Sequence, residues 1–228
     1  MSRVLFIGAH PDDIELGCGA TINKLATKGI KIKVLTLAEG TSARYENYET
    51  NKPEIKKAIQ ARREKSISSL KNLGVSDSLF FDLPCGRLNI VPLLKINKII
   101  ESVICEFKPT EIYTHSAVDT NKDHRVVFES TRIATRPSAF PFVRNVFCYE
   151  VLSSTENAFT NSFNPSVFIE VSIDNIKKKK ESLQIYDTEM RQFPNSRSIE
   201  GIEILARYRG MQVNKAYAEA YELLRCVQ

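Results

Sequence analysis

The chain has 228 residues, of which 43% are hydrophobic and 26% charged, and its formal net charge is +5. This composition is that of a globular protein with a sizeable core, so it excludes an intrinsically disordered chain. No apolar run approaches the roughly 18 residues of a membrane span, and the basic residues are dispersed along the chain. We therefore expect neither a membrane span nor a nucleic-acid partner.

The cysteines indicate a reducing compartment. No two of them have the spacing of a cysteine-based zinc site, so we interpret all five as reduced thiols. They are Cys18, Cys85, Cys105, Cys148 and Cys226. The apolar run at residues 4–7 is too short for the core of a signal peptide, and we expect a cytoplasmic protein.

Strand-like and helix-like patterns alternate along the whole chain. In chain order, they predict a strand at residues 4–7, a helix at 16–28, strands at 32–37 and 79–81 on either side of a helix at 62–73, a helix at 93–107, a strand at 111–114, a helix at 123–134, strands at 146–151 and 167–171, and helices at 175–187 and 199–207. The alternation favours an α/β fold with a mostly parallel central sheet. No linker or repeat interrupts it, so residues 1–228 are expected to form a single domain.

Two acidic clusters contain all three histidines of the chain. The first, His10-Pro11-Asp12-Asp13, follows the predicted strand at residues 4–7, and the second runs from His115 to His124 directly after the strand at 111–114. Because active sites of open parallel sheets form at the carboxyl ends of strands, these two turns are expected to face one crevice.

Imidazole and carboxylate groups are the ligands of a divalent metal such as zinc. His10, Asp13 and His124 are the expected ligands, and a fourth position would stay open for water. Asp12 would be the general base, and Asp123 an orienting group beside His124. Two histidines and one carboxylate also suit other divalent ions. Taken singly, Asp12 and Asp13 could instead cap a helix.

Other classes of site fit less well. A dinucleotide-binding turn lacks its third glycine, because Ile22 stands there, and the preceding carboxylates would repel pyrophosphate. A cysteine hydrolase based on Cys18 is opposed by the same carboxylates, and no Gly-x-Ser-x-Gly motif occurs.

The segment from Ala9 to Thr21, AHPDDIELGCGAT, resembles the signature of the PIG-L/LmbE-like family of N-acetylglucosaminyl deacetylases. Residues 35–44, the helix at 62–74, the Asp123-His124-Arg125 motif and weaker similarity at 196–198, 207–210 and 218–220 extend it over nearly the whole length. The resemblance implies a Rossmann-like three-layer sandwich. It also implies zinc at His10, Asp13 and His124, with Asp12 as base.

The chain departs from this family at one position. Many members have a histidine three residues before the second zinc-binding histidine, and this chain has Asn121 there. Asparagine can donate a hydrogen bond but cannot deliver a proton. We therefore expect Asn121 to hold the oxyanion or the sugar, and His115 to protonate the leaving amine or orient the group that does. Arg44, in the loop after the second strand, is a candidate for binding substrate hydroxyls or phosphate.

The expected function is a metal-dependent hydrolase that removes the acetyl group from a small N-acetylated amino sugar. The alternatives are an inactive metal-binding or sugar-binding module, and a hydrolase of another amide such as a thiol-sugar conjugate. Retention of Asp12 argues against a pure binder, which needs no base. The sequence does not identify the sugar, and because relatives often assemble, a homo-oligomer is a further expectation.

Overall fold

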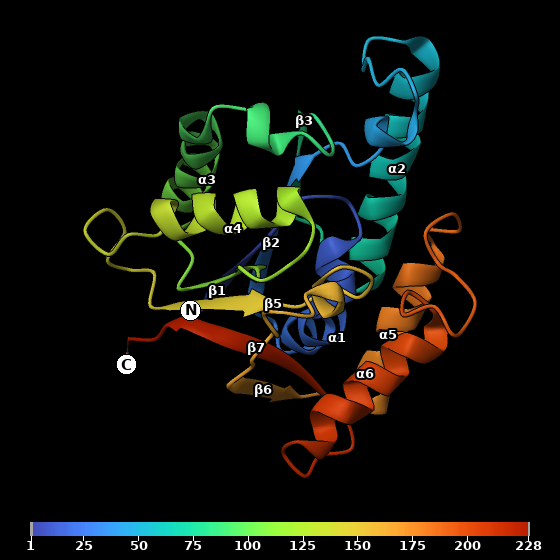
Figure 1. Cartoon of the computed structure of the whole chain (residues 1–228). Coiled ribbons are helices and arrows are strands. Elements are labelled where there is room, and N and C mark those ends of the chain that lie inside the picture. The colour runs from blue at the N-terminus through green and yellow to red at the C-terminus, as the bar shows by residue number, and fades with distance from the viewer. Residues whose placement is uncertain (1, 228) are drawn as a thin grey trace.

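The computed structural model describes residues 2–227 (Figure 1). In chain order, its strands and α-helices are β1 (Arg3–Gly8), α1 (Asp13–Thr27), β2 (Lys31–Ala38), α2 (Pro53–Asn72), β3 (Ser78–Leu83), α3 (Leu93–Phe107), β4 (Glu111–His115), α4 (Lys122–Ala134), β5 (Asn145–Tyr149), β6 (Val167–Glu170), α5 (Ile173–Gln184), α6 (Ile199–Met211) and β7 (Ala218–Arg225).

The strands form one mixed sheet with the order β3-β2-β1-β4-β5-β7-β6. The five strands from β3 to β5 are parallel, whereas β7 runs antiparallel to both of its neighbours. The chain leaves β1 toward β2 on one side and later returns to β4 on the other. The direction of the connections therefore reverses between β1 and β4, and open α/β sheets bind ligands at the carboxyl ends of strands beside such a reversal.

Helices cover both faces of the sheet, as the prediction of a three-layer α/β fold required (Figure 1). On one face, apolar residues of α1, α2, α5 and α6 form a core with β1 and β2, including Leu16, Leu70, Leu183 and Ile202. On the other face, α3 and α4 bury a second core against the same strands. The middle strands are apolar on both sides because both sides are covered.

Two elements differ most from the sequence prediction, whereas the others shift by a few residues at their ends. Helix α2 begins at Pro53, nine residues before the expected start, and proline is favoured in the first turn of a helix. The sequence pattern missed this first part of the helix because Ile55 is the one residue there that is fully buried. Strand β7 was not predicted, since its sequence AEAYELLR is rich in helix-forming residues. Pairing between β5 and β6 overrides that local preference.

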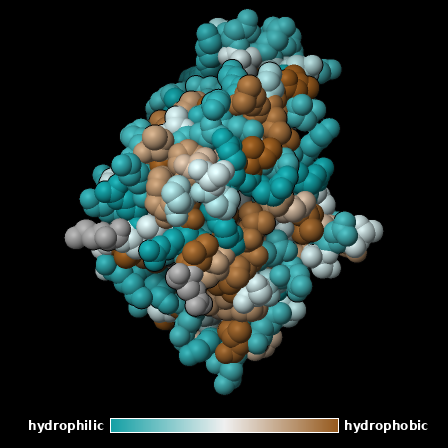
Figure 2. Space-filling view, turned by 90° about the vertical axis from the view of Figure 1, so that its left-hand side faces the viewer, coloured by the Kyte–Doolittle hydropathy of each residue, from teal (hydrophilic) through white to brown (hydrophobic). Residues whose placement is uncertain are grey.

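The surface mixes polar and apolar side chains. Figure 2 shows one face on which hydrophobic residues form patches interrupted by hydrophilic ones. Among residues 2–227, no helix is both long enough and apolar enough to cross a membrane.

Candidate metal centre and active site

The turn between β1 and α1 presents the first acidic cluster. Asp12 has a φ angle of 99°, a left-handed conformation that is costly for residues other than glycine. Residues in such strained conformations are often found at functional sites. Although Asp12 stands at the N-cap position of α1, its side chain makes no capping hydrogen bond. Asp13 instead turns back, and its Oδ2 accepts the backbone N–H of His10 at 2.8 Å. The two carboxylates therefore point to different partners, and neither acts as a simple helix cap.

Three side chains from the two clusters converge as a candidate metal centre. Donor atoms of His10, Asp13 and His124 all lie within 4.8 Å of one another. Asp13 Oδ2 lies 3.3 Å from His10 Nδ1 and 3.2 Å from His124 Nε2. Tetrahedral zinc with bonds of about 2.0–2.1 Å separates its ligands by about 3.3–3.4 Å. Both ring nitrogens of His124 are buried, and among residues 2–227 their contacts with Asp13 and Asp119 lack hydrogen-bond geometry. The three groups therefore fit a divalent metal.

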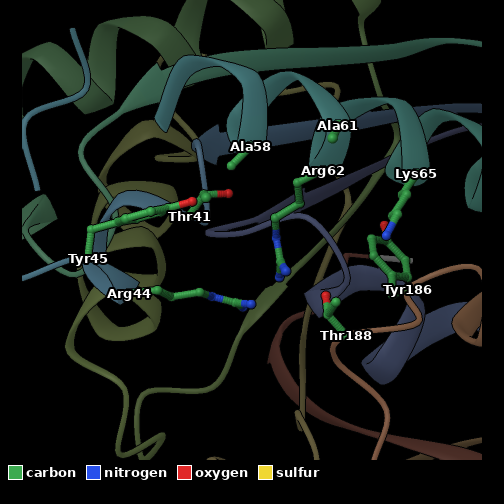
Figure 3. A pocket seen from close by; sticks show the side chains of 9 residues that line it. All are labelled: Thr41, Arg44, Tyr45, Ala58, Ala61, Arg62, Lys65, Tyr186 and Thr188. Carbon is green, nitrogen blue, oxygen red and sulfur yellow. The ribbon is translucent and has the colours of Figure 1, made fainter. Parts of the chain in front are cut away.

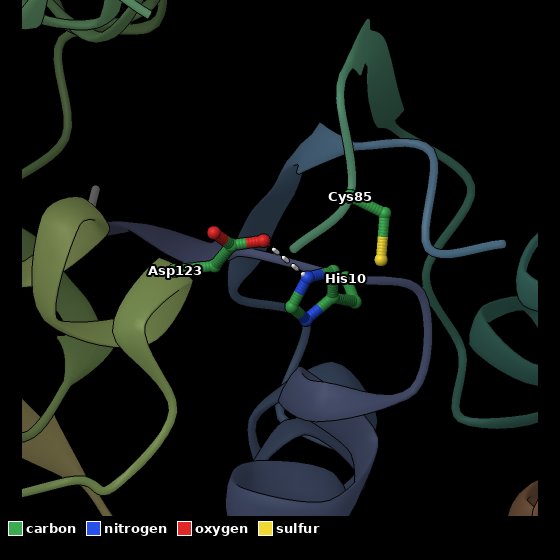
Figure 4. Close-up of side chains that lie close together, drawn as sticks. All are labelled: His10, Cys85 and Asp123. Carbon is green, nitrogen blue, oxygen red and sulfur yellow. Dashed lines mark hydrogen bonds and ion pairs between the residues drawn. The ribbon is translucent and has the colours of Figure 1, made fainter. Parts of the chain in front are cut away.

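Two further carboxylates hold the histidine rings of this centre. Asp123 Oδ2 lies 2.9 Å from His10 Nε2, the nitrogen opposite the one that faces Asp13 (Figure 4). Asp119 Oδ2 lies 3.0 Å from His124 Nδ1 and accepts the hydroxyl groups of Ser154 and Thr155. Carboxylates placed in this way fix the tautomer and orientation of metal-binding histidines.

The electrostatics of the centre favour a cation. Burial lowers the pKa of His10, but hydrogen bonds with Asp123 and Asp13 outweigh it and raise the pKa well above its usual value. Burial likewise opposes charge on His124, yet Asp13 and Asp119 raise its pKa to about 9. The pKa of Asp13 is lowered because the two rings more than offset its desolvation. The carboxylates that favour a positive charge on these imidazoles would equally favour a bound metal cation.

Asp12 lies beside this group and is held by two arginines. Its Oδ2 accepts hydrogen bonds from Arg62 Nη2 and Arg197 Nη1, both at 3.1 Å. Desolvation raises the pKa of Asp12, although Arg62 and Arg197 oppose the change. A carboxylate with a raised pKa is a stronger base, and this one is only 2% exposed.

A cavity of about 290 Å³ opens next to Arg62. It is lined by Thr41, Arg44, Tyr45, Ala58, Ala61, Arg62, Lys65, Tyr186 and Thr188 (Figure 3). Arg44 and Arg62 reach toward the same region from a short 3₁₀ helix (Ser42–Arg44) and from α2. Glu189 joins them, since it accepts hydrogen bonds from Arg44, Arg62 and Arg197. The arginine cluster therefore links the cavity wall to Asp12.

His115 lies behind the centre. Its ring is fully buried and stacks on that of His124, with centroids 4.0 Å apart. Nε2 accepts the backbone N–H of Ala9 at 2.9 Å, and Tyr149 Oη lies 3.3 Å away. Burial and the positive potential of His124 lower the pKa of His115 well below its usual value. Both causes favour the neutral form of the His115 ring, and its part in catalysis stays a prediction.

Asn121 caps α4. Its Oδ1 accepts the N–H of Asp123 at 2.9 Å, while its own N–H donates to Asp119. The side-chain amide nitrogen stays available, so the capping role and a hydrogen bond to substrate are compatible.

Three functional candidates were not assigned from the sequence. Arg62 and Arg197 form ion pairs with Asp12, and Glu189 forms an ion pair with Arg62. Arg197 and Glu189 lie more than 170 residues from Asp12 in loops without periodicity, so no local pattern signals the contact. Arg62 and Arg197 stand in segments that carried the family resemblance, which was the available signal.

A family model and a curated protein are similar to this chain. Residues 5–135 match the family described as PIG-L: GlcNAc-PI de-N-acetylase. The uncharacterized deacetylase YaiS of Escherichia coli K12 is 31% identical over 173 residues, which cover 72% of this chain and 80% of that protein.

Solved structures share the fold over nearly the whole chain. N,N'-diacetylchitobiose deacetylase from Pyrococcus horikoshii has a TM-score of 0.75 and 17% identity, covering 98% of this chain and 84% of its own. The 4-carboxy-2-hydroxymuconate hydratase GalB from Pseudomonas putida KT2440 has a TM-score of 0.75 and 21% identity, covering 100% of this chain and 99% of its own. One fold thus occurs in a deacetylase and in a hydratase, and the chemistry must be argued from the site.

Proposed function

Since the chain belongs to the PIG-L family of de-N-acetylases, we propose that it is a metal-dependent deacetylase that hydrolyses an N-acetylated amino sugar to acetate and a free amine. The observation that carries this proposal is one arrangement of four side chains. His10, Asp13 and His124 converge on a common point, while the adjacent Asp12 is left out of that group and held by arginines.

The division of labour between the neighbouring carboxylates follows from their partners. Asp13 faces two imidazole nitrogens and would hold the metal together with His10 and His124. When bound, zinc would supply Lewis acidity toward the acetyl oxygen and lower the pKa of water to about 7. Iron or manganese would suit the same donors.

Asp12 would carry the proton. Its Oδ2 is fixed by Arg62 and Arg197, and its raised pKa makes it a competent base toward the attacking water. The same carboxyl group, once protonated, can deliver that proton to the departing sugar amine. If Asp12 acts first as the base and then as the acid, the reaction needs no histidine as general acid. This is consistent with Asn121 at the position where many family members have an additional histidine.

His115 and Asn121 then take supporting roles in the proposal. His115 keeps the ring of His124 in place by stacking and by its bond to the Ala9 amide. Asn121 fixes the start of α4, and its free amide hydrogens would bind a sugar hydroxyl or the oxyanion. Asp123 orients His10.

The cavity beside Arg62 is the proposed sugar site. Arg44 is half exposed there and offers fixed donors to hydroxyl or anionic groups, while Tyr45 supplies an apolar ring face. The alternative of a pure sugar-binding module leaves the strained, arginine-held Asp12 without a task.

The test is release of acetate from a panel of N-acetylated amino sugars, presented free, nucleotide-linked and conjugated to a thiol-bearing group. We expect one class to be hydrolysed by zinc-loaded protein and not by protein stripped with a chelator, with activity restored on adding zinc. Equal release with and without metal, or no release from any compound, would contradict the proposal.

A further inference from the structure

The His10 ring also belongs to a second set of possible metal ligands. Cys85, Asp123 and His10 each place a donor atom within 4.8 Å of the others. Figure 4 shows the ring of His10 between the carboxylate of Asp123, from α4, and the thiol of Cys85, from the loop after β3. Cys85 is a free thiol and half-buried.

The loop that carries Cys85 is fixed in place by hydrogen bonds. Asp123 accepts the backbone N–H groups of Gly86 at 2.6 Å and Leu88 at 2.9 Å, and Glu39 accepts that of Cys85 at 2.9 Å. These bonds tie the thiol to the same carboxylate that contacts His10. The three donors are therefore preorganised, which reduces the ordering that binding would require.

The two nitrogens of His10 serve different sides of the ring. Nδ1 faces Asp13 at 3.3 Å, toward the proposed catalytic metal, whereas Nε2 faces Asp123 at 2.9 Å. We propose that Cys85, Asp123 and His10 Nε2 form a second, inhibitory site for a thiophilic divalent cation such as Zn²⁺ or Cd²⁺.

The chemistry of this donor set supports a soft or borderline cation. Thiolate, imidazole and carboxylate are the three ligand types of protein-bound zinc. Binding releases the thiol proton and the proton between His10 Nε2 and Asp123, and the thiolate and carboxylate supply two negative charges to the cation. When the catalytic metal also occupies Nδ1, the His10 ring bridges the two cations as an imidazolate. The second cation would share the His10 ring with the proposed catalytic centre, because it binds Nε2 of the ring whose Nδ1 faces Asp13. Excess cation therefore inhibits, while the first equivalent activates.

Binding at this site is independent of the proposed function, and only the inhibition rests on it. The first experiment is a titration with Cd²⁺ followed by equilibrium dialysis and by the ultraviolet absorption of the cadmium–thiolate bond. We expect the wild-type protein to bind one more equivalent than Cys85→Ala and to show an absorption band that this variant lacks. Cys105→Ala, which removes an exposed thiol on α3, is the matched control and should behave like the wild type.

The second experiment measures inhibition by excess Zn²⁺ on whichever substrate proves active. The concentration for half-inhibition should rise by at least about tenfold in Cys85→Ala, the scale on which loss of a metal partner weakens affinity. If no substrate is hydrolysed, the proposed function fails while the cadmium titration still decides the second site.

Retention of the band and of the same stoichiometry in Cys85→Ala would overturn the inference. If the variant does not fold, alkylation of the wild-type protein by iodoacetamide decides instead. Mass spectrometry should then find Cys85 protected by Cd²⁺ added beyond one equivalent, and full labelling of Cys85 under that condition would refute the site.

Discussion

Glu15 should make the stability of this protein depend on pH. Its side chain is only 2% exposed, and its Oε1 accepts the hydroxyl of Tyr186 at 2.6 Å. Burial raises the pKa of Glu15 from its ordinary value of 4.5 to about 7, although the hydrogen bond from Tyr186 acts to lower it. A raised carboxyl pKa means that the folded state resists ionisation, so the unfolded state is favoured as pH rises from 4.5 to 7.

The magnitude follows from the two pKa values. A pKa difference of about 2.5 corresponds to a loss of at most about 3 kcal/mol in the free energy of unfolding. This loss begins as the pH rises through 4.5, and it reaches its full size above pH 7. Glu15→Gln removes the charge and keeps an acceptor for Tyr186. The variant should therefore unfold like the wild type at pH 4.5 and be more stable at pH 8, by an amount approaching that limit.

The assay is urea unfolding of both proteins at pH 4.5 and pH 8 in the presence of a chelator, so that metal binding does not vary with pH. Groups that do not interact with Glu15 titrate equally in both proteins and cancel in the difference. Glu106→Gln, at an exposed position on α3, is the control, and its stability should stay closer to that of the wild type at pH 8 than the stability of Glu15→Gln does. The reasoning is refuted if the Glu15→Gln difference is the same at both pH values.

Three further predictions concern the site. Asp119→Asn should weaken zinc affinity by about 10–100-fold, as measured by competition with a chromophoric chelator, because Asn cannot hold His124 as a charged acceptor. Arg197→Gln should move the acidic limb of the pH profile of kcat/KM to higher pH, because Arg197 lowers the pKa of Asp12. If that limb does not move, Asp12 is not the group whose ionisation produces it. His115→Gln, which can still accept the Ala9 amide, should lower kcat by less than about tenfold without changing the pH profile. A loss of about a hundredfold or more with zinc retained would return the acid role to His115.

The sequence predicted what depends on local pattern. The helices and most strands follow hydrophobic periodicity, and the strand-end rule brings His10 and His124 into one crevice although 113 positions separate them. Their role as ligands remains a prediction, as does the role of Asp12 as base.

The remainder depends on long-range packing. β7 is a strand because two neighbours offer it hydrogen bonds, which its own composition does not reveal. Arg197 and Glu189 reach Asp12 and Arg62 from loops whose position is set by α5 and α6. Such contacts carry no sequence spacing, and a single sequence cannot show them.

The most direct test of the account compares wild-type protein with Asp12→Asn at equal zinc content. Asn keeps the size of Asp12 and can still hydrogen-bond to Arg62, but it cannot take a proton. We predict unchanged zinc binding and a fall in acetate release of at least about a hundredfold, the scale of general-base catalysis. Zinc content that falls with activity would make Asp12 a ligand, and undiminished acetate release would contradict its role as the base.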